Sequence, residues 1–314
     1  MNPSPVFFRD KWVNQRILLP LLLVLSMMLS GCDRTSTQLY TRKKDVIYGH
    51  KDGMALTLDV FTPQRNANGI GIIWLVSGGW VSTHEFITIG FSKSMIDALV
   101  RRGYTVFAVV HGSQPKFTIP EMLKDVRRSV RYVRYHAADY NIAPDRIGIT
   151  GASSGGQLAL MQAVNGDSGN PDAADPVERI SSRVQAVACF FPPTDFLDYG
   201  HPDADALGRG ILKGFPAPFA FGAADPAKKR EIGRQISPIN FATADDPPTL
   251  IIHGDKDPLV PIQQSKMMIT RLKKEGVSAR LIIKPGGGHG WPGIDRDMPK
   301  IAEWFDKYLL RNKE

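Results

Sequence analysis

The sequence predicts an α/β fold in which helices cover both faces of a mostly parallel central sheet. Two observations predict it. Short apolar runs typical of buried strands alternate along the chain with longer segments whose apolar residues recur at helical spacing. The composition, with 43% hydrophobic and 22% charged residues, is that of an ordinary globular protein. In such a fold the functional residues are expected where the strands end.

The elements follow a regular order, without an internal repeat or a second domain. Strands are expected at residues 45–48, 54–61, 69–76, 104–110, 147–150, 185–190, 248–253 and 279–283, the first two as an antiparallel start. Helices are expected at residues 91–102, 121–140, 157–164, 262–275 and 298–310. Thr118 and Glu121 have the spacing of a capping box at the start of the longest helix.

Two stretches interrupt this order. Residues 166–180 are polar and contain Gly, Asp and Pro, which is typical of a surface loop. Residues 196–244 lie between two expected core strands and are predicted to form a small cap over the sheet; the alternative is a peripheral segment without substrate contact. Phe215, Phe219 and Phe221 either line a pocket there or anchor this insertion on the core.

A glycine-flanked serine stands between an expected strand and an expected helix. Residues 151–155 read Gly-Ala-Ser-Ser-Gly, a G-x-S-x-G match centred on Ser153. On a sharp strand-to-helix turn such a serine projects its hydroxyl above the sheet, and the glycines let the backbone turn tightly. The alternative is an ordinary Gly/Ser-rich turn, so partners for the serine must be found downstream.

Those partners follow in the order serine, acid, histidine. Asp255 and Asp257 come after one late strand-type run, and His289 comes after the next. A histidine can take the proton of a serine hydroxyl, and a buried carboxylate fixes the histidine tautomer. The chain order is that of an α/β-hydrolase. On spacing alone both aspartates remain candidates for the acid.

From about residue 45 to its end the chain resembles the α/β-hydrolase superfamily. Residues 253–260, His-Gly-Asp-Lys-Asp-Pro-Leu-Val, resemble the acid loop of prolyl-oligopeptidase-like hydrolases and related acyl esterases. This resemblance implies that Asp257 is the acid and that Asp255 forms the turn.

A second loop carries a resemblance to esterases. Residues 77–80, Ser-Gly-Gly-Trp, resemble the His-Gly-Gly-x-Trp loop of acetyl-esterase, feruloyl-esterase-like and kynurenine-formamidase-like enzymes. Serine stands where histidine is usual, and one residue is missing before Trp80. The expected oxyanion hole combines the N–H of Ser154 with that of Gly79 or Trp80.

The N-terminus resembles a bacterial lipoprotein signal. Three basic residues precede an apolar run at 17–28, and Leu-Ser-Gly-Cys follows at 29–32. The resemblance implies that Cys32 is acylated and becomes the new N-terminus; the alternative is an uncleaved anchor. Asp33 resembles an inner-membrane retention signal of enterobacteria-like lipoproteins.

These features predict the domain organisation and the location. Residues 1–31 are expected to be a signal peptide, 32–44 a tether and 45–314 the hydrolase domain. The protein is then lipid-anchored in the bacterial cell envelope, on the periplasmic or extracellular side. The oligomeric state is not indicated.

Several other functions are not expected. The net charge of +8 comes from dispersed basic residues without a nucleic-acid-binding motif. The histidines lack metal-ligand spacing, so neither a metal nor another cofactor is predicted. His111 is a weak candidate for a supporting role, and Cys189 reads as a buried hydrophobe. The basic residues of the longest helix are expected on a solvated face: Lys124, Arg127, Arg128, Arg131 and Arg134.

The sequence therefore predicts a serine hydrolase, with a carboxylic-ester hydrolase of small acyl or carbohydrate esters as the first hypothesis. A prolyl-oligopeptidase-like serine peptidase acting on peptides is the first alternative. A non-catalytic binding lipoprotein on the same fold is the second, because the loop at residues 77–80 departs from the family pattern.

Overall fold

The structure is a computed structural model that describes residues 38–219 and 225–310. The predicted signal peptide, Cys32, Asp33 and Phe221 lie outside the described residues. Across the two described ranges, none of the helices has the length and apolar character needed to cross a membrane.

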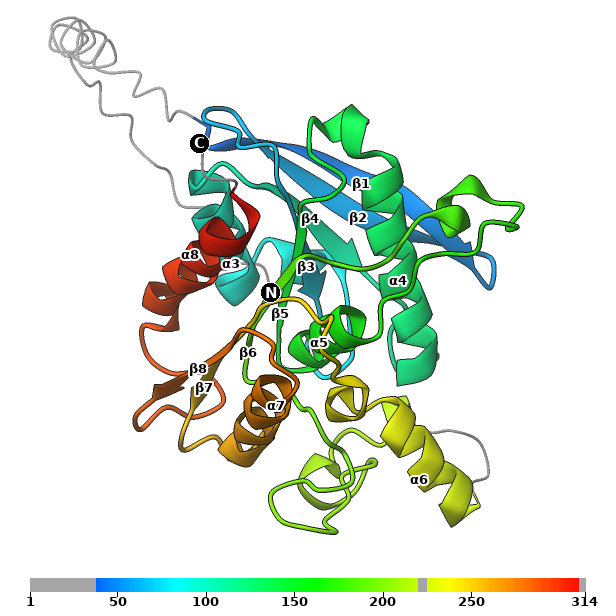
Figure 1. Cartoon of the computed structure of the whole chain (residues 1–314), viewed down its shortest axis with the longest axis vertical. Helices are drawn as coiled ribbons and strands as arrows, with labels where there is room; N and C mark the ends of the chain where they lie inside the picture. Colours follow the sequence, from blue (N-terminus) through cyan, green and yellow to red (C-terminus); the bar gives the residue numbers. More distant parts are fainter. Residues whose placement is uncertain (1–37, 220–224, 311–314) are drawn as a thin grey trace, which may run out of the picture. The chain divides into compact units, whose positions relative to one another are not determined.

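An eight-stranded sheet forms the centre of the fold (Figure 1). Its strands are β1 (Tyr40–Lys51), β2 (Met54–Pro63), β3 (Gly71–Val76), β4 (Thr105–Val110), β5 (Ile147–Ala152), β6 (Ala186–Phe190), β7 (Thr249–Gly254) and β8 (Ala279–Lys284). Their order is β1-β2-β4-β3-β5-β6-β7-β8. β2 pairs antiparallel with β1 and β4, and all other neighbours are parallel. The predicted mostly parallel α/β sheet is confirmed.

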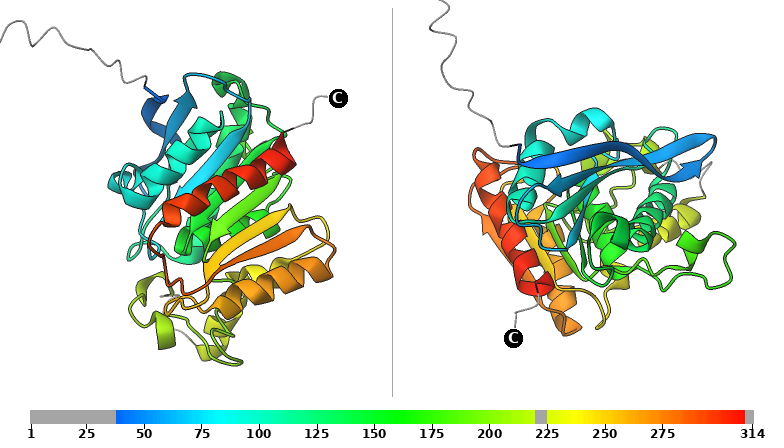
Figure 2. Two further views of the ribbon diagram at one scale, coloured as in Figure 1. Left: turned by 90° about the vertical axis from the view of Figure 1, so that its left-hand side faces the viewer. Right: turned by 90° about the horizontal axis from the view of Figure 1, so that it is seen from above.

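Helices cover both faces of this sheet, as Figure 2 shows. They are α2 (His84–Ile87), α3 (Gly90–Arg101), α4 (Ile119–Tyr135), α5 (Ser154–Val164), α6 (Pro226–Gln235), α7 (Ile262–Lys274) and α8 (Met298–Leu309). α3 and α8 pack together against one hydrophobic cluster, whereas α4, α5 and α7 contribute to the other. Because both faces are covered, central strands such as β3 are buried at every position.

The first strand begins earlier than predicted. β1 starts at Tyr40, inside the segment 32–44 that the sequence suggested was a tether. β1 lies at the edge of the sheet and exposes polar residues such as Thr41 and Lys43. Edge strands tolerate this polarity, so composition alone resembled a linker. Arg42 ties the strand down through Asp59, with Nε 2.7 Å from Oδ2.

The basic face of α4 is not simply solvated, which corrects the prediction. Arg131 is buried; its NH1 lies 2.7 Å from Glu178 Oε2, and its NH2 pairs with Asp167. Arg128 donates to Asp175 and Glu178. These contacts hold the polar loop 166–180 against the helix. The pattern of the helix could not show this, because the partners lie far away along the chain.

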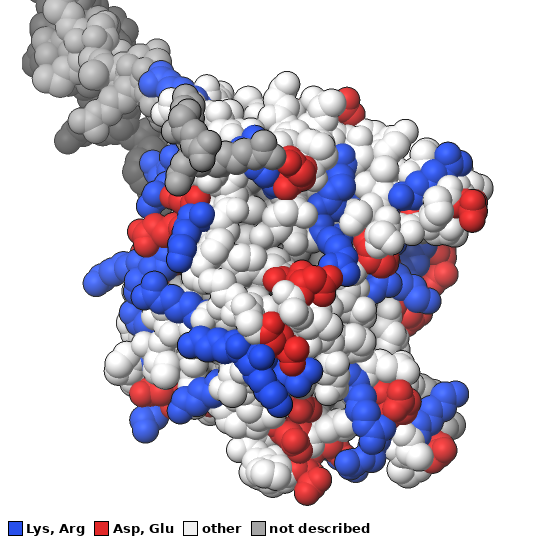
Figure 3. Space-filling model, in the orientation of Figure 1, with Lys and Arg blue, Asp and Glu red and all other residues white. Residues whose placement is uncertain are grey.

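Basic and acidic side chains are interspersed on the face seen in Figure 3, including the right-hand side where α4 lies. Thr118 and Glu121 form the predicted capping box of α4, with the Thr118 N–H 2.8 Å from Glu121 Oε2. α4 ends at Tyr135, and a short 3-10 turn, Ala137–Tyr140, completes the segment that was predicted as one helix.

The insertion at residues 196–244 is mostly irregular. Its described parts contain α6 and three short 3-10 turns, η3 (Gly210–Leu212), η4 (Ala217–Phe219) and η5 (Pro238–Phe241). Phe219 is buried, with its ring 5.2 Å from those of Trp80 and Phe196. Phe219 therefore anchors the insertion on the core, which was one of the two roles considered for it.

Candidate active site

Ser153 occupies a strained turn between β5 and α5. Its φ of 54° and ψ of −122° are unusual for a residue with a side chain. Its N–H donates to Phe190 O at 3.0 Å. A Cβ on Gly151 would lie 2.3 Å from Gly155 O, and one on Gly155 would lie 2.8 Å from Leu75 O. The elbow therefore requires glycine at both positions.

The structure brings together the serine, the histidine and one of the two aspartates. Ser153 Oγ lies 2.9 Å from His289 Nε2, and His289 Nδ1 lies 2.8 Å from Asp257 Oδ2. The Asp257 carboxylate accepts a hydrogen bond from His289 Nδ1, so Nδ1 carries the proton. His289 Nε2 is then free to accept a hydrogen bond from the serine hydroxyl. These residues come from the ends of β5, β7 and β8, at one edge of the sheet.

Hydrogen bonds hold Asp257 in its ionised form. Burial by itself would raise the pKa of this carboxyl, but hydrogen bonds from His253, His289 and the Val260 N–H lower it well below its usual range. Oδ1 accepts from the N–H groups of Leu259 and Val260, each at 2.9 Å. A negative charge is thus fixed beside His289 at neutral pH.

Asp255 does not contact His289 through any hydrogen bond in the described structure. Its Oδ1 accepts the Gly286 N–H at 2.7 Å, and the side chain ties the loop after β7 to the loop after β8. This is the turn-forming position that the family resemblance implied, and Asp257 occupies the position beside the histidine.

The loop after β3 is a tight hairpin turn. Gly78 and Val81 exchange both backbone hydrogen bonds, at 2.9 and 3.0 Å. Gly79 and Trp80 between them have φ of 57° and 61°, as in a type I′ turn. Gln114 donates its side-chain amide to Gly79 O at 2.9 Å and its own N–H to Trp80 O at 3.1 Å. These two hydrogen bonds from Gln114 therefore hold the turn in its conformation.

The three N–H groups proposed for an oxyanion hole remain available. Within residues 38–219 and 225–310, those of Ser154, Gly79 and Trp80 make no hydrogen bond to another backbone group. Leu75 in β3 pairs with Gly151 in β5, and this register places the turn beside the elbow. The N–H groups of Gly79 and Trp80 therefore both remain candidates for the second donor of the oxyanion hole.

Two side chains near the elbow were not given a role from the sequence. Ser77 lines the cavity beside Ser153, and its Oγ lies 2.9 Å from Ser154 Oγ. His253 is fully buried, with Nε2 3.2 Å from Asp257 Oδ2. A polar residue at the end of an otherwise apolar strand was the available signal for His253.

His111 supports the hairpin turn from within the core. It is buried, and burial lowers its pKa to about 4, so the ring is neutral at physiological pH. Its ring Nδ1 lies 2.7 Å from Gly112 O, and its backbone N–H donates to Ser82 Oγ at 3.2 Å. In the described part of the chain, its ring makes no hydrogen bond to Ser153, His289 or Asp257.

An apolar cavity of about 440 Å³ opens beside Ser153 and His289. The segment from α2 to the start of α3 forms one wall, and the residue after β6 forms another. Its large apolar lining residues are Trp74, Phe86, Ile89, Phe91, Phe191 and Ile294. The insertion contributes none of the described lining residues. The insertion was predicted to shape the pocket, with a peripheral segment without substrate contact as the alternative, and its described residues fit the alternative for this cavity. No role was predicted for the exposed Phe86 and Ile89.

The two tryptophans of the loops pack beneath them. Trp80 is buried among Phe196, Phe215 and Phe219. Trp291 donates its indole N–H to Asp297 Oδ2 at 2.9 Å. Both side chains therefore stiffen the loops that present the polar groups.

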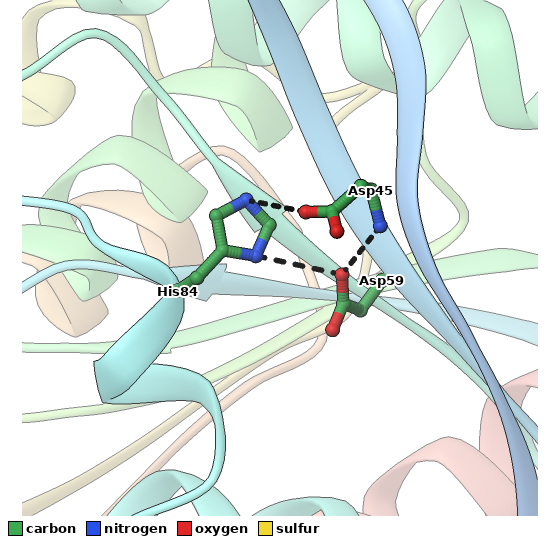
Figure 4. Close-up of side chains that lie close together, drawn as sticks. All are labelled: Asp45, Asp59 and His84. Atoms are coloured by element: carbon green, nitrogen blue, oxygen red, sulfur yellow. Dashed lines mark hydrogen bonds and ion pairs between the residues drawn. The ribbon is translucent and has the colours of Figure 1, made fainter.

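Asp45, Asp59 and His84 form a second cluster of polar side chains (Figure 4). The His84 ring nitrogens face different carboxylates, each at 3.5 Å. Arg42 already neutralises Asp59, with NH2 2.5 Å from Oδ2. A guanidinium at this distance opposes the binding of a cation, so the cluster fits an ion-pair network that joins β1 and β2 to α2.

Several known proteins with similar sequences are named as esterases. The probable carboxylic ester hydrolase LipM of Mycobacterium tuberculosis is 28% identical, over 75% of this chain and 52% of the relative. Esterase LipC of the same organism is 24% identical, over 84% of this chain and 63% of the relative. The chain thus spans about half to two thirds of the length of these relatives.

A solved structure of a truncated carbohydrate esterase from gut microbiota superposes with a TM-score of 0.73 and 30% identity, covering 86% of this chain and 96% of that chain. An acetyl ester-xyloside bifunctional hydrolase from Caldicellulosiruptor lactoaceticus gives 0.67 and 25%, covering 84% and 93%. The family described as BD-FAE matches residues 58–272, which include Ser153 and Asp257. The chain belongs to this BD-FAE family of α/β-hydrolase esterases.

Proposed function

We propose that the protein is a serine hydrolase that cleaves carboxylic esters of small acyl groups or carbohydrates. The observation that carries the proposal is the continuous hydrogen-bonded line from Ser153 through His289 to Asp257 beside an apolar cavity. The esterase names of the relatives support an ester rather than an amide as substrate.

In this mechanism Ser153 Oγ attacks the ester carbonyl while His289 Nε2 takes the hydroxyl proton. The N–H of Ser154, with that of Gly79 or Trp80, stabilises the oxyanion. His289 then gives the proton to the leaving alcohol, and the acyl group stays on Ser153. A water molecule attacks this acyl-enzyme, gives its proton to His289, and releases the acid as Ser153 recovers its proton.

A fluorophosphonate probe on the full-length chain tests this mechanism. Wild type should be labelled and should hydrolyse nitrophenyl esters, and Ser153→Ala should do neither. Ser154→Ala is the matched control, because it removes a neighbouring hydroxyl but keeps the backbone N–H. Retained activity in Ser153→Ala would refute the mechanism.

The choice of substrate separates the alternatives. Faster cleavage of a prolyl peptide amide than of short nitrophenyl esters would move the assignment to a serine peptidase. If a folded sample is not labelled, the turn at Gly79 and Trp80 does not form a working oxyanion hole. A binding protein would then be the favoured assignment.

We further propose that the protein is anchored in a bacterial membrane through a lipid on Cys32. The support is the sequence of residues 17–32. Incorporation of a labelled fatty acid into wild type but not into Cys32→Ser tests this, and equal incorporation would contradict it. Fractionation of inner and outer membranes then tests the role of Asp33.

A further inference from the structure

Two imidazoles share one carboxylate oxygen beside the proposed nucleophile. Asp257 Oδ2 lies 2.8 Å from His289 Nδ1 and 3.2 Å from His253 Nε2. His253 is fully buried in β7, so its contacts with the protein decide its state. Its Nε2 also lies 2.9 Å from Val260 O, and its Nδ1 lies 2.6 Å from Ser265 Oγ.

These partners determine which nitrogen of His253 carries the proton. A carbonyl oxygen and a carboxylate oxygen both accept, so Nε2 must be the donor to Asp257 and Val260. The Ser265 hydroxyl, which is also buried, can then donate to the lone pair of Nδ1. Both ring nitrogens of His253 therefore have hydrogen-bond partners.

The hydrogen bonds of the Asp257 carboxylate are complete. Oδ1 accepts two backbone N–H groups, and Oδ2 accepts from the two imidazoles. Among the described residues, Tyr199 is a further titratable group close enough to Asp257 to feel its charge, and its hydroxyl donates to Leu259 O at 3.1 Å. Burial and the charge of Asp257 raise the pKa of Tyr199, so it stays neutral. Within the described structure, the two histidines are thus the side chains that donate to this carboxylate.

We propose that His253 is a positioning residue that holds Asp257 in place and draws charge from Oδ2, so that Asp257 stabilises protonated His289 only moderately. This inference rests on the proposed function of His289 as the acid–base group. A histidine that must both take and return a proton works best when neither form is held too strongly. An N–H donated by His253 weakens Oδ2 as an acceptor for His289.

Two variants that differ by one methylene provide the test. The amide of His253→Gln reaches the place of Nε2 and can donate to Asp257. The amide of His253→Asn reaches only the place of Nδ1, next to Ser265. His253→Asn should shift the acid limb of the kcat/KM profile to higher pH by about one unit, the lower end of the effect of one hydrogen bond to a charged group. His253→Gln should keep the wild-type limb.

The kinetic constants provide a second comparison. His253→Asn should lower kcat about tenfold with little change in KM, because a misplaced carboxylate affects proton transfer rather than substrate binding. Ser129→Ala is a control for disturbance of a buried polar group, since its hydroxyl bonds only within α4. It should leave the acid limb unchanged. A purely structural role of His253 would lower kcat in both histidine variants without moving the limb.

Proton NMR of the Ser153→Ala protein separates this inference from the proposed function. The signal measured is the low-field resonance of the proton between His289 Nδ1 and Asp257 Oδ2. It should move further downfield when His253→Asn is added to Ser153→Ala, and it should not move when His253→Gln is added. This measurement needs no activity, so it stands even if no ester is hydrolysed. An unchanged signal and an unchanged acid limb in folded His253→Asn would overturn the inference.

Discussion

The indole Nε1 of Trp80 donates to Oε1 of Gln157 at 3.1 Å in the buried core. Trp80 belongs to the hairpin turn after β3, and Gln157 belongs to the helix that follows the nucleophile elbow. The Gln157 N–H bonds Ser153 O at 2.9 Å, and its amide reaches Ile236 O, also at 2.9 Å. One glutamine thus joins the hairpin turn after β3, the turn at Ser153 and the insertion.

Trp80→Phe tests this connection. It keeps an aromatic ring but leaves Gln157 Oε1 buried without its donor, which costs about 1–3 kcal/mol of unfolding free energy. We expect kcat to fall more than KM rises, because the turn that carries the oxyanion donors loses its anchor.

Trp304→Phe is the matched control, because Trp304 Nε1 donates to Pro248 O at 3.2 Å away from the elbow. It should lose stability but keep kcat. Urea unfolding and ester kinetics on both variants make the comparison. Equal kcat losses in the two variants would contradict the connection.

Gly79→Ala should disable the oxyanion loop. Its φ is 57°, and an added Cβ would lie 2.6 Å from the Phe215 ring. Gly276→Ala is the control, because Gly276 has φ of 83° but nothing within 4 Å of the added atom. Both variants bear the cost of a side chain at positive φ, about 1–2 kcal/mol, but Gly79→Ala alone should lose esterase activity.

A double variant tests the steric part of this prediction. Phe215→Ala in the Gly79→Ala background removes the ring that the new Cβ meets, so it should restore part of the activity. Nitrophenyl ester kinetics measure this. Full activity of Gly79→Ala alone would show that the turn geometry is not needed.

The apolar cavity should select the apolar part of the substrate. Ile89 lines it and is exposed, so Ile89→Ser should reduce kcat/KM for nitrophenyl octanoate about tenfold relative to nitrophenyl acetate. Ile47→Ser is the control, because Ile47 is similarly exposed on β1 and lies outside the lining of the cavity. An unchanged octanoate-to-acetate ratio in Ile89→Ser would exclude this wall from substrate binding.

Asp246 should make folding depend on pH. Burial raises its pKa to about 6, against an ordinary value near 4, so the folded state holds a proton that the unfolded state releases. The free energy of unfolding should then fall as pH rises from about 4 to 6, and the loss is complete above that window. Asp246→Asn cannot ionise and keeps an oxygen that can accept from the Thr243 N–H.

We therefore expect Asp246→Asn to be more stable than wild type at pH 7.5, with a difference that shrinks toward pH 4. Asp245→Asn is the control. Hydrogen bonds from Thr243 and Arg183 lower the pKa of Asp245, so its substitution should act in the opposite direction. Urea unfolding across the pH range measures both, and lower stability of Asp246→Asn at pH 7.5 would contradict the prediction.

Local patterns in the sequence were enough to predict the sheet and the three polar residues at its edge. Ser153, Asp257 and His289 each follow an apolar run, and parallel strands bring such positions to the same edge. The sharp turn at Ser153 could be predicted from its flanking glycines, because the local backbone conformation depends mainly on neighbouring residues. The roles of these three residues in catalysis remain a prediction.

Contacts between distant segments could not be predicted in this way. The family resemblance had implied Asp257 as the acid, and the tertiary structure places Asp257 and not Asp255 beside His289. Only the tertiary structure decided that Phe86 and Ile89 wall the cavity. It also placed His253 on the same carboxylate oxygen as His289.

The physical reason is the difference between burial and pairing. A run of apolar residues encodes that a segment is buried, and its flanking residues encode where it turns. Strand order, register and the packing of loops decide which side chains then meet, and these depend on the whole chain at once. The sequence by itself therefore determined the fold class and the candidate chemistry, whereas the tertiary structure decided how the polar groups of the site are paired.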